Sequence, residues 1–190
     1  HKVYGEATAI LAGDALLTDA FSLAAQAKIP AENAVFALSV LSECAGSRGM
    51  VGGQVLDMAG EGRSLSLSEL ELLQSLKTGA LISAAAELGC IAAGGSPEQR
   101  RAVARYAQKL GRAFQIRDDM LDVTGTTEEF GKPVGSDRSR EKNTFVTALG
   151  LEGSGALVEQ LTEEAVSALN GFPQPDFLIW LARELASRRK

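Results

Sequence analysis

The chain has 190 residues, of which 45% are hydrophobic and 23% charged, and its formal net charge is −5 at pH 7. This length suits one domain, 1–190, with a single core. The acidic balance argues against nonspecific nucleic-acid binding, which needs a basic face. An anionic substrate must then be met by local cations or by a metal ion. No apolar run approaches the ~20 residues that cross a bilayer, so we expect no membrane span.

The first half of the chain predicts helices that are separated by glycine, proline and polar breaks. Aromatic residues make up only 5%, whereas Ala and Leu are abundant, which favours helices over strands. Pro30 ends the first helix. Ser68 and Glu71 match a capping box, in which each side chain bonds the backbone N–H of the other residue. The helices expected here cover 4–27, 31–50, 54–60 and 68–93.

The second half predicts one long helix, a loop and three shorter helices. Ser96 and Pro97 form a start signal, with Ser96 as the cap and Pro97 at the first helical position. Residues 124–143 lack helical periodicity, and a loop of about 20 residues inside a compact domain is usually functional or disordered. The helices expected here cover 97–123, 144–151, 155–170 and 175–188. We therefore predict an all-α fold, a bundle of antiparallel helices with short connections.

Three carboxylates lie on one turn near the end of the long helix. At about 100° per residue, Asp118, Asp119 and Asp122 share an arc with Gln115. Like charges one turn apart repel, so a helix accepts them either as a solvated acidic face or to hold a cation. The helix is apolar on both sides of this arc, and the following loop returns basic residues to the same helix end, which favours the cation. Those basic residues are Lys132, Arg138, Arg140 and Lys142.

The donor types on this helix select among metal ions. Oxygen-only ligands suit Mg²⁺, which uses one or two carboxylates plus substrate phosphates. A zinc or di-iron site lacks support, because His1 is the only histidine. Two more polar pairs are candidates for the same cleft. Gln54 and Asp57 share a helical face and are either a hydrogen-bonded core pair or part of the site. Lys77 and Thr78 interrupt an apolar helix, where a lysine either extends to solvent or binds phosphate.

Six segments, in this order along the chain, resemble the trans-isoprenyl diphosphate synthases. They are HKVYGEATAILAGDALLTDAF, GGQVLDM, KTGALI, FQIRDDMLD, the GKPVGSD loop and EKNTF. The chain is most similar to the short-chain bacterial farnesyl and geranylgeranyl diphosphate synthases, and the similarity spans nearly its whole length. The motifs are specific as a set, although a DDxxD motif alone is not.

This resemblance implies a fold and a reaction. The family folds as an all-α antiparallel bundle of the isoprenoid synthase type around a central apolar cavity. It condenses an allylic diphosphate, dimethylallyl or geranyl diphosphate, with isopentenyl diphosphate. Mg²⁺ and cations stabilise the leaving diphosphate. The implied product is a short-chain trans-prenyl diphosphate, farnesyl or geranylgeranyl, plus diphosphate.

The resemblance also implies a role for each site residue. The second aspartate-rich motif, which holds Mg²⁺, consists of Asp118, Asp119 and Asp122, and Asp118 is the expected direct ligand. The positions that contact the allylic diphosphate or shield the cation are Lys77, Thr78, Gln115 and Lys132. Lys142 matches the basic residue that follows the active-site loop, 124–143. The cavity is lined by Gln54 and Asp57.

The chain departs from the family at its start. Family members carry N-terminal helices and a first aspartate-rich motif, followed by paired arginines, upstream of the segment that matches His1-Lys2-Val3. The chain therefore resembles the C-terminal portion of a synthase, and we expect this portion to be inactive alone. The resemblance further implies a cytoplasmic enzyme and a homodimer with the helices around 4–50 near its interface.

Two alternatives share parts of this pattern. A terpene cyclase has the same fold and ionisation chemistry, but cyclases usually replace the second motif with an Asn/Ser/Glu metal triad, and QIRDDMLD together with Lys77-Thr78 argues against that. A non-catalytic subunit of a heteromeric synthase tends to lose the aspartates, whereas this chain keeps all three. The prenyltransferase is therefore the preferred hypothesis.

Overall fold

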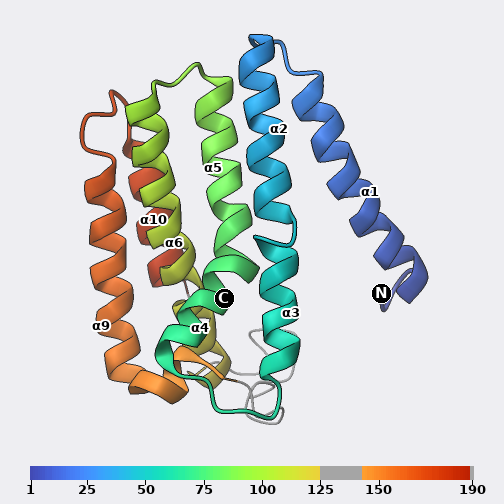
Figure 1. The fold of residues 1–190 in the computed structure, drawn as a ribbon. Helices are drawn as coiled ribbons and strands as arrows, with labels where there is room; N and C mark the ends of the chain where they lie inside the picture. The colour runs from blue at the N-terminus through green and yellow to red at the C-terminus, as the bar shows by residue number, and fades with distance from the viewer. Residues whose placement is uncertain (125–142, 189–190) are drawn as a thin grey trace.

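A computed structural model of the chain describes residues 1–124 and 143–188, and within them every regular element is a helix (Figure 1). The predicted all-α fold is therefore confirmed. The elements are α1 (Glu6–Ala25), α2 (Ala31–Ala45), α3 (Met50–Gly60), α4 (Leu67–Gln74), η1 (Ser75–Gly79), α5 (Ala80–Ala92), α6 (Pro97–Thr124), α9 (Phe145–Ala168) and α10 (Asp176–Ser187).

The helices form a bundle with α6 at its centre. In Figure 1, α2, α5, α6 and α9 stand side by side, α10 lies behind α6 and α9, and α1 stands at the edge beyond α2. Helix α6 packs against α5, α9 and α10, whereas α1 packs against α2 and has no buried residue. The long helix that carries the carboxylates is thus also the main packing element of the fold.

Two apolar clusters contain successive stretches of α6. The first joins α6 to α4 and α9 and consists of Leu70, Ala113, Ile116, Phe145, Val158 and Leu161. The second joins α6 to α9 and α10 and consists of Tyr106, Ala107, Leu110, Ala165, Leu169 and Ala182. The Tyr106 hydroxyl donates to the backbone oxygen of Leu178 at 2.7 Å, and burial raises the pKa of Tyr106 to about 12. Both clusters anchor α6 against rotation, because its apolar residues face partners on several sides.

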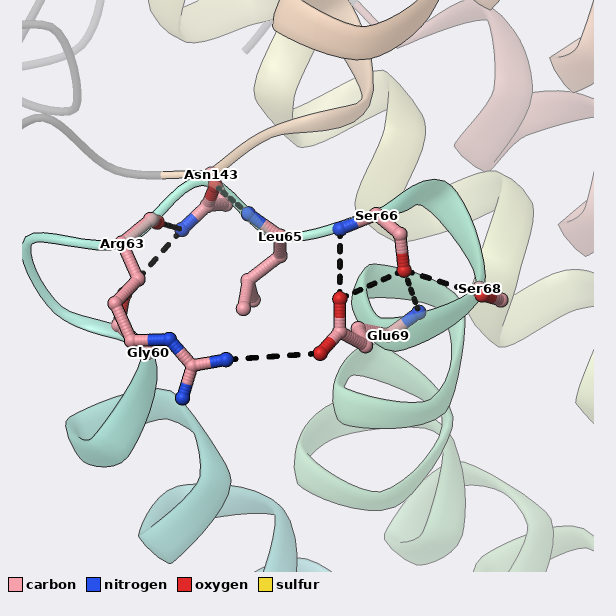
Figure 2. A network of polar contacts seen from close by, with 7 residues as sticks. All are labelled: Gly60, Arg63, Leu65, Ser66, Ser68, Glu69 and Asn143. Atoms are coloured by element: carbon pink, nitrogen blue, oxygen red, sulfur yellow. Dashed lines mark hydrogen bonds and ion pairs between the residues drawn. The ribbon is translucent and has the colours of Figure 1, made fainter.

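The capping box at the start of α4 lies two residues earlier than predicted. Ser66, not Ser68, is the N-cap: its Oγ accepts from the Glu69 backbone N–H at 3.3 Å, and the Glu69 carboxylate accepts from the Ser66 N–H at 2.8 Å (Figure 2). The sequence offers two overlapping boxes. The earlier one lets Glu69 also pair with Arg63, at 3.7 Å, and leaves Glu71 to pair with Arg112 on α6.

Asn143 ties the α3–α4 connector to the start of α9. Its Oδ1 accepts from the Leu65 N–H at 2.8 Å, and its Nδ2 donates to the Arg63 carbonyl at 2.7 Å and the Gly60 carbonyl at 3.5 Å (Figure 2). The connector turns at Gly62, whose φ of 71° is the left-handed region that suits glycine. Segments that are about 80 residues apart in sequence are thereby joined at one end of the bundle.

Besides shifts of one or two residues at helix ends, the structure differs from the predicted helices in three places. The helix expected over 31–50 ends at Ala45 and resumes at Met50. The helix expected over 68–93 contains a π-helical turn, η1. The two helices expected over 144–151 and 155–170 form one element, α9, with a kink at Gly150, whose φ is 73°. A glycine at such a φ breaks the helical path without a steric penalty.

Two segments are long and apolar enough to cross a bilayer by length and composition. Glu6–Ala25 has a mean hydropathy of 1.3 and Ala31–Gly60 has 1.2. The expectation of no membrane span was based on unbroken apolar runs. Isolated charged residues such as Asp14 and Asp19 interrupt such a run, but they lower the mean hydropathy of the segment only slightly. Core helices of soluble proteins meet the same criterion. The absence of a membrane span therefore stays a prediction.

The position of the capping box can be tested with two serine variants. Ser66→Ala should lower the free energy of unfolding by about 1 kcal/mol, because it removes the acceptor of the Glu69 N–H. Ser68→Ala is the matched control and should change it by less than about 0.5 kcal/mol. Urea unfolding of both variants measures the difference. A larger loss for Ser68→Ala would restore the later box.

Candidate active site

Lys77 and Thr78 lie on the π-helical turn η1, which is held between glycines of two neighbouring helices. A Cβ at Gly53 of α3 would lie 2.2 Å from the Lys77 nitrogen and 2.6 Å from its Cα. On the other side, a Cβ at Gly111 of α6 would lie 3.3 Å from the Cα of Gly79. Single π turns inside α-helices occur frequently at functional sites. Here the π turn carries Lys77 and Thr78, and both neighbouring helices approach its backbone closely.

The Lys77 ammonium group pairs with Asp57 on α3. The Nζ–Oδ2 distance is 2.5 Å, and the two side chains are 32% and 30% exposed. Gln54, one turn earlier on α3, is exposed. A pair this open to solvent contributes at most about 1 kcal/mol. Lys77 can therefore exchange its carboxylate partner for a phosphate oxygen at little cost.

A chain of hydrogen bonds runs from η1 through α6 to the start of α9. The Thr78 hydroxyl donates to Gln115 Oε1 at 3.2 Å, and Gln115 Nε2 donates to Asp119 Oδ1 at 2.9 Å. The second oxygen of Asp119 accepts from the backbone N–H of Phe145 at 2.8 Å. Asp119 is only 4% exposed. The chain thus joins two predicted substrate-binding residues to a buried carboxylate.

Asp118 faces a cation that the sequence pattern did not reveal. Arg188, just after α10, donates from Nη2 to Asp118 Oδ1 at 3.0 Å, and its guanidinium lies 4.0 Å from the ring centroid of Phe114. The Arg188 carbonyl accepts two hydrogen bonds from Arg117, at 3.0 and 2.8 Å. The only sequence signal was the basic Arg188-Arg189-Lys190 end after an amphipathic helix.

The donor set around Asp118 fits a hard cation. A guanidinium already occupies one carboxylate oxygen of Asp118, and Asp122, one turn further along α6, is half-buried. Among residues 1–124 and 143–188, no group of three or more His, Cys, Asp or Glu side chains could hold a metal ion alone. Mg²⁺ needs only one or two carboxylates when substrate phosphates complete its coordination.

Among the surface grooves of the part of the chain that the structure describes, two are large, and the smaller of them borders η1 at Ser75, Leu76 and Gly79. One, of about 940 Å³, lies between α6 and α9 and includes Arg105, Lys109 and Glu164. The other, of about 610 Å³, lies beside α4, α5 and α6 and includes Glu71 and Arg112. Neither is lined by Lys77, Gln115 or Asp118. The central apolar cavity therefore stays a prediction. The candidate active site is placed by its polar residues, from Lys77 on η1 to Asp118 on α6.

Comparison with known proteins decides the family. The model of the polyprenyl synthetase family matches residues 1–169. The chain belongs to the polyprenyl synthetase family. It is 46% identical over 157 residues to a farnesyl diphosphate synthase of Geobacillus stearothermophilus, covering 81% of this chain and 53% of that protein. It is 44% identical over 191 residues to one of Micrococcus luteus, covering 100% of this chain and 66% of that protein.

Solved structures agree with this assignment. The geranylgeranyl pyrophosphate synthetase of Pyrococcus horikoshii matches with a TM-score of 0.88 and 28% identity, covering 99% of this chain and 69% of that one. A geranyltransferase of Helicobacter pylori, solved with magnesium and isoprenyl diphosphate, matches with a TM-score of 0.81 and 36% identity, covering 97% of this chain and 61% of that one. The resemblance to isoprenyl diphosphate synthases is therefore confirmed, fold included.

This polyprenyl synthetase chain is shorter than its relatives. It spans between 49% and 66% of the length of the curated relatives that it matches at 39–46% identity. This fraction agrees with the expectation that the chain corresponds to a portion of a synthase. Activity, substrates and partners accordingly belong to the whole protein.

The structure shows direct contacts among five of the site residues that the sequence proposed. Asp57 pairs with Lys77, Thr78 donates to Gln115, and Gln115 donates to Asp119. These contacts do not include Gln54, Asp118 or Asp122. Lys132 and Lys142, with the rest of the predicted loop 124–143 except its two end residues, lie outside the described residues. The roles of Asp118, Asp119 and Asp122 as metal ligands stay predictions.

The close approach at Gly53 can be tested by adding one methyl group. Gly53→Ala should lower the free energy of unfolding by about 1–3 kcal/mol, because the new Cβ overlaps the Lys77 backbone. Gly89→Ala on α5 is the matched control, since a Cβ there meets nothing within 4 Å. The control should keep or raise stability, by up to about 1 kcal/mol. Equal effects of the two variants in thermal unfolding would contradict the close contact.

Proposed function

We propose that the full-length protein containing this chain is a Mg²⁺-dependent short-chain trans-prenyl diphosphate synthase. It would condense dimethylallyl or geranyl diphosphate with isopentenyl diphosphate, and farnesyl diphosphate is the proposed product, with geranylgeranyl diphosphate as the longer alternative. The observation that carries this proposal is the hydrogen-bonded pair of Thr78 and Gln115 beside the exchangeable Lys77, in a chain 46% identical to a farnesyl diphosphate synthase.

The proposed reaction breaks one C–O bond and forms one C–C bond. The allylic C–O bond breaks, and diphosphate leaves with the electron pair. The double bond of isopentenyl diphosphate attacks the allylic carbon, and a proton is then lost to the departing diphosphate. Lys77 would release Asp57 and bind a diphosphate oxygen, whereas the oxygens of Thr78 and Gln115 would face the positive carbon. Lys132 and Lys142 are proposed as further diphosphate contacts.

Magnesium is the proposed metal, and Asp118 is its proposed principal ligand. When bound, Mg²⁺ neutralises charge on the leaving diphosphate. Asp118 is suited to hold it because its side chain is 47% exposed and its partner Arg188 is itself a cation. Asp122, on the same face of α6, is the proposed second carboxylate. Arg188 would move off Asp118 when a divalent ion takes its place.

We further propose that the full-length protein is a cytoplasmic homodimer without a membrane span. Support for the homodimer comes from α1, which has no buried residue but carries exposed apolar side chains along its length. These are Ile10, Leu11, Leu16, Leu17 and Leu23. A second copy would cover them, and an exposed apolar surface of this kind usually marks an interface.

The proposed reaction can be assayed with the full-length protein. Isopentenyl diphosphate is supplied with dimethylallyl or geranyl diphosphate, and products are identified by mass spectrometry. We expect linear farnesyl or geranylgeranyl diphosphate, and turnover that EDTA abolishes and Mg²⁺ restores. A cyclic product from geranyl or farnesyl diphosphate alone would identify a terpene cyclase. Activity only with a second subunit would identify a member of a heteromeric synthase.

The role of Asp118 predicts a specific loss of turnover. Asp118→Ala in the full-length protein should lower kcat by about 100-fold or more, with little loss of thermal stability, because a half-exposed carboxylate contributes little to folding. Glu159→Gln, which neutralises an exposed carboxylate of α9, is the control and should keep wild-type kcat. An almost unchanged rate for Asp118→Ala would show that the acidic arc is a solvated face.

A further inference from the structure

The three carboxylates of the aspartate-rich turn have different surroundings. Asp119 is 4% exposed, whereas the Asp118 side chain is 47% exposed. Arg188 donates to Asp118. Each oxygen of Asp119 accepts a hydrogen bond, Oδ1 from the Gln115 amide and Oδ2 from the Phe145 backbone N–H. A buried carboxylate that accepts two well-formed hydrogen bonds is suited to holding its donors in place.

The contact with Asp119 decides which way the Gln115 amide points. An ionised carboxylate can only accept hydrogen bonds, so the NH₂ group of Gln115 must face Asp119. The carbonyl oxygen of Gln115 must then face the opposite way, where it accepts from the Thr78 hydroxyl at 3.2 Å. Without Asp119, the amide could rotate and present its NH₂ group to Thr78 instead.

The same carboxylate also holds the start of α9. Phe145 is the first residue of α9, and its N–H is one of the donors that a helix start leaves without an intrahelical partner. Asp119 Oδ2 accepts from it, and the Thr144 side chain accepts from Thr147 in the capping box beside it. A negative charge at this helix end is also favoured by the helix dipole. Asp119 thus links the orientation of Gln115 to the docking of α9.

We propose that Asp119 is a positioning residue that acts through Gln115 and not through the metal. It fixes the amide so that the carbonyl oxygen, which carries partial negative charge, points to the side of Thr78 and Lys77. In the proposed prenyl transfer, this oxygen stabilises positive charge on the allylic carbon, and an NH₂ group in its place would oppose that charge. The catalytic part of this inference rests on the proposed function.

Asp119→Asn is the sharpest substitution, because it keeps the shape and removes one acceptor. Gln115 and Phe145 both donate to Asp119, and a single Asn carbonyl can satisfy only one of them. In the full-length protein, Asp119→Asn should lower kcat by about 10- to 100-fold and change the KM for the allylic diphosphate by less than about 3-fold. The Asn carbonyl can keep the contact with the Phe145 N–H, and its NH₂ group then faces Gln115 and favours the reversed orientation of the Gln115 amide.

A double-mutant cycle with Gln115→Ala separates positioning from other roles. If Asp119 acts through Gln115, Asp119→Asn should lower kcat by less than about 3-fold in the Gln115→Ala background. If the kcat loss of the double variant equals the product of the two single losses, the proposal is overturned. If Asp119→Asn does not fold, Asp119→Glu, which keeps both acceptor oxygens, enters the same cycle.

Metal binding gives a readout that needs no turnover. Mn²⁺ is titrated into the full-length protein with inorganic diphosphate and followed by electron paramagnetic resonance. Asp119→Asn should keep the number of bound ions and their affinity within about 3-fold, whereas Asp118→Asn should weaken binding by about 10-fold or more. Equal weakening by both variants would make Asp119 a ligand and overturn the inference.

The two levels of the proposal fail in different ways. If the wild-type protein forms no prenyl product, the proposed function is wrong, and the catalytic role of Asp119 is wrong with it. The Mn²⁺ titration still decides in that case whether Asp119 is a metal ligand. If the product forms and the kcat losses multiply, only the positioning role is wrong.

Discussion

The site depends on the close contact of backbones around the π turn between α4 and α5. Gly53 and Gly111 approach this turn from α3 and α6, and neither position has room for a normal Cβ contact. The contact sets where Lys77 and Thr78 emerge. The ion pair to Asp57 and the hydrogen bond to Gln115 both start from this turn, so each depends on the distance that the two glycines allow.

Helix α6 combines two tasks that usually fall to different elements. Its apolar residues join both clusters of the core, and its polar arc carries the aspartates and Gln115. Because the core holds α6 from several sides, its polar side chains keep a constant direction. The surrounding ion pairs, Lys77 with Asp57 and Arg188 with Asp118, are partly solvent-exposed and therefore weak. This combination gives a rigid backbone whose charged groups can change partners.

Parts of the fold and of the site could be predicted because they depend on local patterns. The long helix over 97–123, its Ser96-Pro97 start and the shared arc of the aspartates follow from helical periodicity and capping chemistry. The choice between Ser66 and Ser68 could not be predicted. Both fit the local capping rule, and the contacts of Arg63 and Arg112 with the neighbouring glutamates favour the earlier serine. The π turn was also missed, because no local signal in residues 75–79 marks it, and the backbones that approach it belong to other helices.

By itself, the sequence determined the all-α fold, the family and the set of polar residues that could form a site, because helical period, capping signals and motif order are properties of the chain alone. Only the tertiary structure decided how those residues differ from one another. Asp118 meets Arg188, which follows it by 70 residues, and Asp119 meets Phe145 at the start of another helix. Burial and hydrogen-bond partners depend on the packing of distant segments. Asp118 and Asp119, which look equivalent on one turn, therefore differ in exposure and in partner.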